Sequence, residues 1–162
     1  MNDHDVLVIG AGPAGLATSA CLRAQGVSHQ VIEREGEIAA SWRRHYDRLH
    51  LHTTKRYSGL PLSPWPGSAP RYPSRTQVVD YLKDYAVTHA ITPDLGVEVH
   101  RVRRHDKHFV VETSRGTRTP RAVIVATGYN GVANIPHFPG LNAFGGEVIH
   151  TVAYNNPKHY AG

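Results

Sequence analysis

The sequence predicts an α/β fold with a doubly wound parallel sheet of the Rossmann type, and three observations carry this prediction. A short apolar run, 5–9, ends at a glycine-rich turn. A stretch with helical apolar spacing, 14–25, is followed by a second strand-like run, 28–33. A later segment, 121–126, is continuously apolar from Ala122 to Ala126, which is typical of a strand buried on both faces. The first three segments form a βαβ unit, whose strands are parallel and whose crossover is right-handed.

The first predicted helix, 14–25, ends before Gly26, a residue type that suits the position just after a helix. Helical spacing predicts an inward face made of Leu16, Ala17, Ala20, Cys21 and Ala24. Cys21 is the single cysteine, and we expect it to be a buried packing residue. One cysteine allows neither an internal disulfide nor a CxxC redox pair, and it fits a reducing cytoplasm.

The segment 36–73 shows no regular apolar period, is rich in proline and contains both tryptophans. Long irregular segments within a domain are usually functional or disordered. Its aromatic residues argue for order; they are Trp42, Tyr46, Tyr57, Trp65 and Tyr72. We therefore expect an ordered loop that packs against a ligand or a second domain.

A capping box formed by Ser74 and Gln77 begins a second helix, which we expect to run to about His89. Its predicted apolar face consists of Val78, Val79, Leu82, Tyr85 and Ala86. Three β segments should follow, at 97–99 with Val102, at 109–113 and at 121–126. We expect the residues 114–116 to form a hairpin turn between the last two, and the last to be a central strand of the parallel sheet.

Composition describes one globular domain, with 162 residues of which 40% are hydrophobic and 19% charged. No apolar run approaches the ~20 residues of a membrane helix, so we expect no membrane span and a cytoplasmic location. The net charge is +5, but its Lys and Arg residues are scattered, so we expect no nucleic-acid partner. The 12 histidines include no HExxH motif. His50 and His52 lack a third ligand nearby, so we expect no metal site.

The turn after the first strand carries the strongest chemical signal, a GxGxxG motif formed by Gly10, Gly12 and Gly15. In this motif the first glycine permits the tight turn, the second lets backbone approach a pyrophosphate, and the third lets helix and strand pack closely. The helix N-terminus faces the phosphates. Glu33, at the end of the second strand, can accept both ribose hydroxyls of an adenosine and disfavours a 2′-phosphate. The residues leave NAD and FAD as the two candidate ligands.

The turn after the last strand favours FAD by resemblance. Ala126-Thr127-Gly128 resembles the ATG motif of two-dinucleotide flavoproteins, in which this turn runs close to the FAD. The preceding β segments are similar to the β-meander inserted into the FAD domain of those proteins. The resemblance thus implies an incomplete FAD domain, in which a Rossmann-like sheet carries an inserted β-meander.

A further motif narrows the resemblance to one family. Phe144, Gly146, His150 and Tyr154 stand at the fixed positions of FxGxxxHxxx(Y/F), the identifying sequence of flavin-containing monooxygenases. Tyr154-Asn155 differs from the ending of the Baeyer–Villiger branch. The segments 41–49, 64–66 and 72–75 are similar to plant YUCCA-type monooxygenases and their bacterial relatives, so the resemblance covers about 5–162.

This resemblance implies an NADPH-dependent enzyme that uses O₂ and a C4a-hydroperoxyflavin to oxygenate a small organic substrate. The FAD-binding residues it implies are Gly10, Gly12, Pro13, Ala14, Gly15, Glu33, Arg34, Trp42, Arg43, Ala126, Thr127 and Gly128. Animal-type members carry an Asn near the position of His52, so His52 is a candidate to lie near the flavin. No residue is implied as a general acid or base.

In the family a second GxGxxG, which binds NADPH, follows the position of Gly162. We therefore expect 1–162 to be the N-terminal portion of an FAD-binding domain. Within it, 36–73 would be the loop on the cofactor and substrate side, and 140–162 a linker toward an absent NADPH domain. By itself this chain is expected not to turn over NADPH. The sequence defines neither the substrate nor the oligomeric state.

Three alternatives stay open. A disulfide reductase of the same fold superfamily is opposed by the lack of a CxxC pair. A single-domain NAD-dependent dehydrogenase is opposed by the ATG-like turn and the predicted meander. A non-catalytic FAD-binding fragment is compatible with every motif described above.

Overall fold

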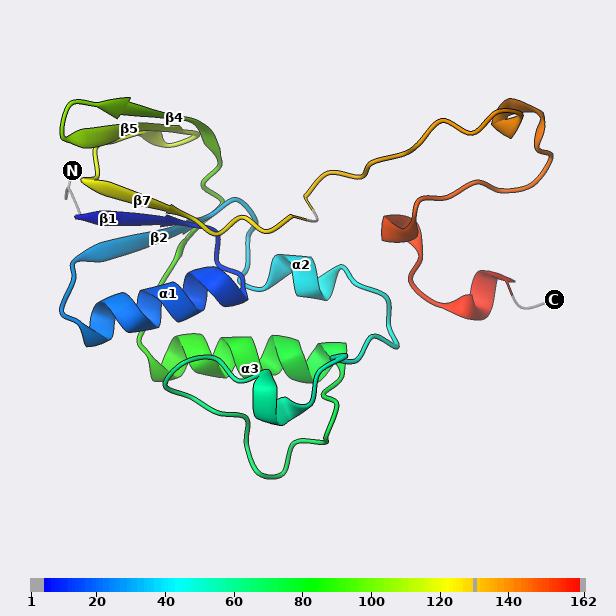
Figure 1. The fold of residues 1–162 in the computed structure, drawn as a ribbon, viewed down its shortest axis with the longest axis horizontal. Helices are drawn as coiled ribbons and strands as arrows, with labels where there is room; N and C mark the ends of the chain where they lie inside the picture. The colour runs from blue at the N-terminus through cyan, green and yellow to red at the C-terminus, as the bar shows by residue number, and fades with distance from the viewer. Residues whose placement is uncertain (1–4, 130, 161–162) are drawn as a thin grey trace.

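A four-stranded parallel sheet forms the centre of the molecule, with strand order β3-β2-β1-β7 (Figure 1). Our computed structural model describes residues 5–129 and 131–160. The strands are β1 (Val6–Ile9), β2 (His29–Glu33), β3 (Asp94–Leu95) and β7 (Ala122–Val125). Val8 of β1 lies beside Val31 of β2 and Ile124 of β7, and both pairings are parallel. The predicted parallel βαβ unit is therefore confirmed.

Helices cover one face of this sheet, and a second, antiparallel sheet covers the other (Figure 1). The helices are α1 (Pro13–Ala24), the short α2 (Ala40–Arg43) and α3 (Arg75–Thr88). The second sheet has the order β4-β5-β6, with β4 (Val99–His105), β5 (His108–Thr113) and β6 (Gly116–Arg118). The parallel sheet with its antiparallel meander is the fold class that the motifs predicted.

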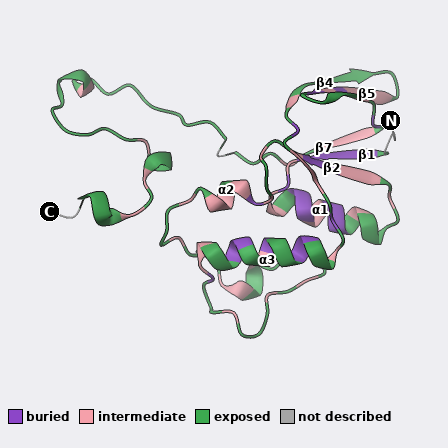
Figure 2. Ribbon diagram, turned by 180° about the vertical axis from the view of Figure 1, so that it is seen from behind, coloured by how far each residue is buried: buried purple, intermediate pink, exposed green. Residues whose placement is uncertain are grey.

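Alternate residues of β1 belong to two different hydrophobic clusters, which explains why the whole strand is apolar. Val6 and Val8 pack with the residues of α1 and α3. Leu7 and Ile9 pack on the opposite face, in a cluster that includes Val111 of the meander. Figure 2 shows the buried residues gathered along β1 and on the facing sides of the two long helices. Because both faces of β1 are covered, a polar residue at any of its positions would be buried.

The capping box of α3 is confirmed. The Ser74 side chain accepts a hydrogen bond from the Gln77 amide, and the Gln77 side chain accepts one from the Ser74 amide at 2.9 Å. The buried residues of α3 are those predicted from helical spacing, namely Val78, Val79, Leu82, Tyr85 and Ala86. Local capping and apolar periodicity thus predict where this helix begins and which of its residues face the core.

The expectation that Cys21 is buried is wrong, because its side chain is exposed. The buried stripe of α1 is Gly15, Leu16, Ser19 and Ala20, so the sheet lies against a different part of the helix than the apolar spacing suggested. Ser19 is tolerated there because its hydroxyl lies 2.7 Å from Nε2 of His29. Ser19, a polar residue with a hydrogen-bond partner, therefore lies on the buried side of α1, and Cys21 lies on the exposed side.

The predicted connection between the last two β segments also needs correction. The turn at 114–116 joins β5 to β6, a short strand that the sequence did not reveal, and the chain then continues to β7 in the other sheet. The Thr113 hydroxyl fixes this turn, since it accepts from the Arg115 amide and donates to the Gly116 carbonyl. The first segment begins at Val99 rather than at Val97, which is buried ahead of the strand.

Strand β7 was predicted to be a central strand. In the structure it lies at the edge of the described sheet. Val125, near its end, is 68% exposed. An apolar run shows only that a strand can be buried on both faces, and it does not reveal how many neighbours the strand has. The parallel pairing of β7 with β1 is nevertheless as predicted.

Much of the irregular segment 36–73 is fastened to α3 of the same domain. It contains α2 and a 3-10 turn, Lys55–Tyr57, which the sequence did not predict. The Tyr81 hydroxyl accepts from the Leu60 amide and donates to the Ser63 carbonyl, and the Tyr81 ring stacks on Trp65 with a centroid distance of 4.2 Å. The segment is thus held by specific contacts with α3, whereas the expected packing against a ligand or a second domain stays a prediction.

Tyr85 supplies a further attachment, and its phenol gives a testable dependence of stability on pH. The side chain is 2% exposed and donates a hydrogen bond of 2.8 Å to the Pro61 carbonyl. Desolvation by burial is the main cause that raises the pKa of Tyr85 to about 12. A raised pKa means that the folded state binds the Tyr85 proton more tightly than the unfolded state does. The contribution of this phenol to the free energy of unfolding is therefore fully present below pH ~10 and is lost between pH ~10 and ~12.

We expect Tyr85→Phe to lower the free energy of unfolding by about 1–3 kcal/mol at neutral pH, because the Pro61 carbonyl loses its partner. The same variant should show a weaker loss of stability than the wild type between pH 10 and 12. Urea unfolding followed by circular dichroism measures both effects. Tyr72→Phe, at a residue that is 43% exposed, is the control, and an equal loss in that variant would contradict the prediction.

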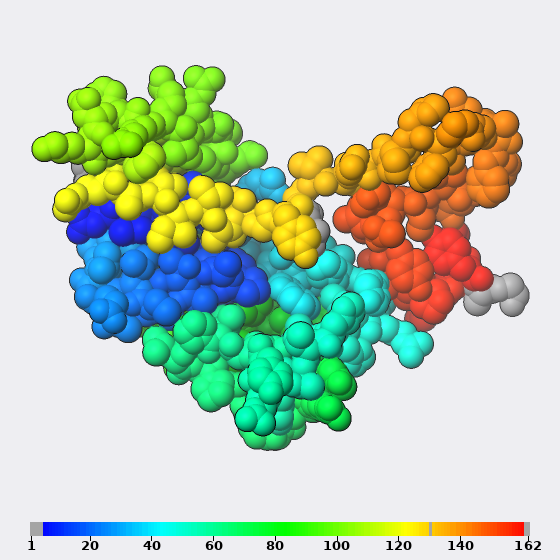
Figure 3. Space-filling model, in the orientation of Figure 1, coloured from blue at the N-terminus to red at the C-terminus, as the bar shows by residue number. Residues whose placement is uncertain are grey.

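Residues 131–160, which we call the arm, come after β7 in the chain and extend away from the two sheets before turning back (Figure 1). The arm contains three 3-10 turns, Leu141–Ala143, Thr151–Ala153 and Pro157–Tyr160. Most of its residues are exposed, and in Figure 3 it stands clear of the second sheet. Within residues 5–129 and 131–160, no helix has the length and apolar character needed to cross a membrane.

Candidate dinucleotide-binding site

The turn between β1 and α1 is closed by two glycines that admit no side chain. Gly10 has a φ of +110°, and a Cβ there would lie 2.5 Å from the Ala126 carbonyl oxygen. A Cβ at Gly15 would overlap the carbonyl oxygen of Gly10. The Gly10 amide donates to the Ile32 carbonyl at 2.7 Å, and the Ala126 amide donates to the Ile9 carbonyl at 2.8 Å. The turn is therefore enclosed by backbone from β2, from α1 and from the segment after β7.

Gly12, in contrast, faces open space. A Cβ at this position would meet no atom within 4 Å. Gly12 is the N-cap residue of α1, no side chain caps the helix there, and Pro13 follows in the first turn. The first amides of a helix have no partner within the helix and carry the positive end of its dipole. The combination of open space and free helix amides suits a pyrophosphate.

Glu33 places its carboxylate at the same turn. Its Oε2 accepts a 2.8 Å hydrogen bond from the Ala11 amide, and its Oε1 accepts a 2.9 Å bond from the Glu35 amide. The side chain is partly buried. A carboxylate has about four lone-pair sites, so acceptor capacity is left for hydroxyl groups of a ligand. The acid at the end of β2 thus faces the glycine turn.

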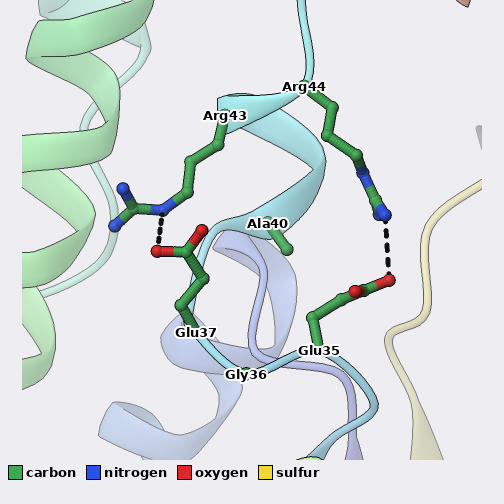
Figure 4. Close-up of a pocket in the computed structure, with 6 residues that line it drawn as sticks. All are labelled: Glu35, Gly36, Glu37, Ala40, Arg43 and Arg44. Carbon is green, nitrogen blue, oxygen red and sulfur yellow. Dashed lines mark hydrogen bonds and ion pairs between the residues drawn. The ribbon is translucent and has the colours of Figure 1, made fainter.

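A pocket of about 340 Å³ lies beside this turn and is lined by Glu35, Gly36, Glu37, Ala40, Arg43 and Arg44 (Figure 4). Arg43 Nε lies 2.9 Å from Glu37 Oε2, and Arg44 Nη1 lies 2.9 Å from Glu35 Oε1. Hydrogen bonds from Arg44 and then from Arg34 hold the pKa of Glu35 below its usual value. Two acids and two guanidinium groups therefore border the pocket as charged pairs.

The pocket is tied to the glycine turn through Ala39. Its amide donates to the Ala11 carbonyl at 3.1 Å, and its φ of 58° bends the chain into α2. Ala39 is 1% exposed, and Trp42 of α2 packs against the same hydrophobic cluster. Trp42 and Arg43, which the sequence placed on an irregular loop, thus lie on a short helix that is anchored to the turn.

His52, a predicted site residue, makes no described contact with this turn. It is exposed, in a bend that follows Leu51, and this part of the chain is joined to the start of α3 by the bridge between His50 and Ser74. Among the described residues, the contacts of its neighbours lead to α3 and not to Gly12 or Glu33. Its suggested place near a flavin stays a prediction.

Comparison with known proteins identifies the family. Residues 7–162 match the family described as pyridine nucleotide-disulphide oxidoreductase. The chain belongs to this family. It is 39% identical over 168 residues to indole-3-pyruvate monooxygenase YUCCA1 of Oryza sativa subsp. japonica, with 96% of the chain and 39% of the relative covered. It is 40% identical over 167 residues to probable indole-3-pyruvate monooxygenase YUCCA8 of Arabidopsis thaliana, with the same coverage of 96% and 39%.

The chain is also similar to the solved structure of a flavin-containing monooxygenase from Stenotrophomonas maltophilia. It superposes with a TM-score of 0.91 at 34% identity, and the match covers 100% of our chain and 49% of that chain. The resemblance to flavin monooxygenases that the motifs suggested is thereby confirmed. The chain spans about two fifths of the length of the plant relatives and about half of the bacterial one.

In this family member, sequence reasoning missed part of the charged pocket. Arg34, Arg43 and Glu33 were predicted site residues, whereas Glu35, Glu37 and Arg44 were not. A signal was present, since charged residues cluster at and directly after the end of the second strand, with three acids and one arginine within 33–37. Which of these charges pair could not be deduced, because Arg44 reaches Glu35 only after the chain bends at Ala39.

The residues of the FxGxxxHxxx(Y/F) motif form local contacts within the arm. A Cβ at Gly146 would collide with the Phe144 ring, so this glycine lets the ring fold over the backbone. His150 Nδ1 accepts from the Val152 amide and caps the turn Thr151–Ala153. The Tyr154 ring lies 6.3 Å from the Tyr46 ring, measured between centroids. The motif therefore shapes the arm and, at its last position, meets the segment after α2.

Proposed function

We propose that this chain binds FAD at the glycine turn and is the FAD-binding part of an NADPH-dependent flavin monooxygenase. The observation that carries the proposal is the contrast among the three glycines. Gly10 and Gly15 are needed for the backbone itself, whereas Gly12 leaves open space at a helix N-terminus, where the backbone amides suit a pyrophosphate. Flavin monooxygenases are also among the relatives and the structural neighbours of this chain.

The residues at this site fit the ADP portion of FAD. The amides of Gly12, Ala14 and Gly15 would bind the pyrophosphate, with Pro13 shaping the first turn of the helix. Glu33 would accept hydrogen bonds from the ribose hydroxyls, and Arg34 would border the adenosine. Arg43 and Trp42 would cover the cofactor from the pocket side. The turn Ala126-Thr127-Gly128 would pass beside it, with Thr127 and Gly128 exposed.

When bound, FAD would supply the redox chemistry that transfers one oxygen atom from O₂ to a small organic substrate, with NADPH as reductant. The chain's own residues would bind and orient the cofactor, and α2, which lines the pocket, would lie beside it. None of the cofactor-binding residues named above is assigned a role as general acid or base. We further propose that 1–162 forms the FAD-binding domain, that 36–73 faces cofactor and substrate, that 140–162 is a linker toward an NADPH-binding domain, and that the protein is cytoplasmic.

A disulfide reductase is less well supported, although the family description includes such enzymes. Reduction of a disulfide through a protein dithiol requires two thiols, and these 162 residues contain one cysteine. Cys21 lies on the exposed side of α1, whereas the glycine turn is at the N-terminal end of that helix. The motifs and the relatives of these 162 residues favour the monooxygenase assignment.

A titration with FAD tests the proposal directly. We expect the flavin fluorescence to change saturably on addition of the chain, and ADP to compete with FAD, because the site is built for the ADP portion. FMN lacks that portion and should bind far more weakly, and NADP⁺ should be disfavoured by the Glu33 carboxylate. Equal binding of FMN and FAD, or no binding of FAD, would overturn the proposal. Anaerobic addition of NADPH to the bound flavin then tests separately whether this chain supports reduction.

A further inference from the structure

Arg75, at the first position of α3, binds the segment that follows α2. Its Nη1 donates to the carbonyls of Arg43 at 3.1 Å and His45 at 2.5 Å, and its Nη2 lies 3.3 Å from Asp47 Oδ1. Its backbone amide donates to the Leu49 carbonyl at 2.7 Å. The last carbonyls of a helix have no partner within it. A guanidinium group offers five donors in a fixed fork, so one side chain can satisfy several such carbonyls together.

Asp47 extends this connection to the arm. Its amide donates to the Asn155 carbonyl at 2.8 Å, and its Oδ2 accepts a 3.1 Å hydrogen bond from Asn156 Nδ2. The neighbouring residues Tyr46 and Tyr154 face each other. Figures 1 and 3 show the end of the arm returning to the segment after α2. The two carboxylate oxygens of Asp47 thus point to two different elements, one to α3 and one to the arm.

An isolated ion pair on the surface contributes little to stability, but this arrangement is not isolated. The Arg75 side chain is only 23% exposed and bridges two carbonyls and a carboxylate. Those carbonyls belong to the same short stretch as Trp42 and Arg43. A displacement of the arm would therefore move Asp47 and, through it, the end of α2, because each step of the connection is a direct hydrogen bond or ion pair.

We propose that Asp47 and Arg75 are positioning residues that latch the arm to α2 and so couple the place of the arm to cofactor binding. The effect on the cofactor rests on the proposed function, whereas the latch itself does not. Neither residue would touch FAD. The side chains act through α2, whose Arg43 borders the pocket.

Hydrogen exchange of the 162-residue chain without FAD tests the latch. We compare the wild type with Asp47→Ala, with Asn156→Ala and with Asp80→Asn, a control that removes an exposed carboxylate of α3. Asp47→Ala should speed exchange in both 43–49 and 150–158, by about tenfold, which is the effect of losing a charge-assisted hydrogen bond. Asn156→Ala changes a residue of the arm and removes its hydrogen bond to Asp47, so faster exchange at 43–49, which extends from Asp47 to the end of α2, is the decisive result. The control should match the wild type.

FAD affinity provides the second measurement. The dissociation constant of FAD should rise about tenfold in Asp47→Ala and about threefold in Asn156→Ala, and Asp47→Glu should recover part of the loss because it keeps the charge. Unchanged exchange at 43–49 in Asn156→Ala would overturn the latch, as would an equal effect of Asp80→Asn. If Asp47→Ala does not fold, as judged by circular dichroism, the Asn156→Ala result decides. Failure of the wild type to bind FAD would refute the proposed function, while the exchange data would still test the latch.

Discussion

The Gly15→Ala variant is expected to lose more than about 3 kcal/mol of folding stability, which is enough to unfold many domains of this size. The added Cβ would overlap the carbonyl oxygen of Gly10. Neither backbone can move away, because Gly10 is hydrogen-bonded to Ile32 and stands against Ala126. Urea unfolding followed by far-ultraviolet circular dichroism measures the loss, and FAD binding should disappear with the fold.

Two further glycine variants show whether the effect is specific. Gly36→Ala adds a Cβ where nothing lies within 4 Å, so its stability should stay within about 1 kcal/mol of the wild type. Gly12→Val is also open to a side chain and should fold normally, yet its side chain would occupy the space that we assign to the pyrophosphate. A Gly12→Val variant that binds FAD as tightly as the wild type would contradict that assignment, and a stable Gly15→Ala would contradict the structural role of Gly15.

The Glu33→Gln variant should weaken FAD binding by about 10- to 100-fold, the effect of losing one or two hydrogen bonds to a charged acceptor. Glu33 accepts from the amides of Ala11 and Glu35. A glutamine amide has one oxygen and would turn an N–H₂ group toward one of these donors. The ribose would then lose a charged acceptor, and the site would lose part of its geometry. Fluorescence titration with FAD measures the change.

Selectivity gives this prediction a sharper form. Removing the carboxylate charge should raise the affinity for NADP⁺ relative to FAD, because the repulsion of a 2′-phosphate is relieved. Glu112→Gln is a matched control, since Glu112 is a partly exposed carboxylate of the meander that pairs with Arg103. Its FAD affinity should equal that of the wild type. If the affinity for FAD and the affinity for NADP⁺ were each the same in the wild type and in Glu33→Gln, the assignment of Glu33 to the binding site would be contradicted.

The elements that the sequence predicted correctly are those in which local signals agree. The capping box and the apolar period of α3 gave its start and all of its buried residues. The all-apolar β1 and its glycine turn gave the parallel pairing with the next strand. In each case the preference is set by residues a few positions apart, so it does not depend on which other part of the chain packs nearby.

The predictions that failed concerned features that depend on contacts between distant parts of the chain. Cys21 and Ser19 were both able to face the sheet, and the hydrogen bond to His29 placed Ser19 inward. β6 carries too few residues, Gly116–Arg118, to show a period, and its pairing with β5 decides that it is a strand. The edge position of β7 depends on the order of strands in the sheet, and an apolar run of four residues is compatible with an edge or a centre.

By itself, the sequence determined that a glycine turn, a helix N-terminus and the Glu33 carboxylate would share one place, because a βαβ unit brings them together whatever surrounds it. Only the tertiary structure decided that Arg44 pairs with Glu35 and that Asp47 joins α3 to the arm. Asp47 and Asn156 lie 109 positions apart. Contacts of that kind depend on the path of the whole chain, and the direction of side chains after each bend is fixed by packing rather than by the residues next to them.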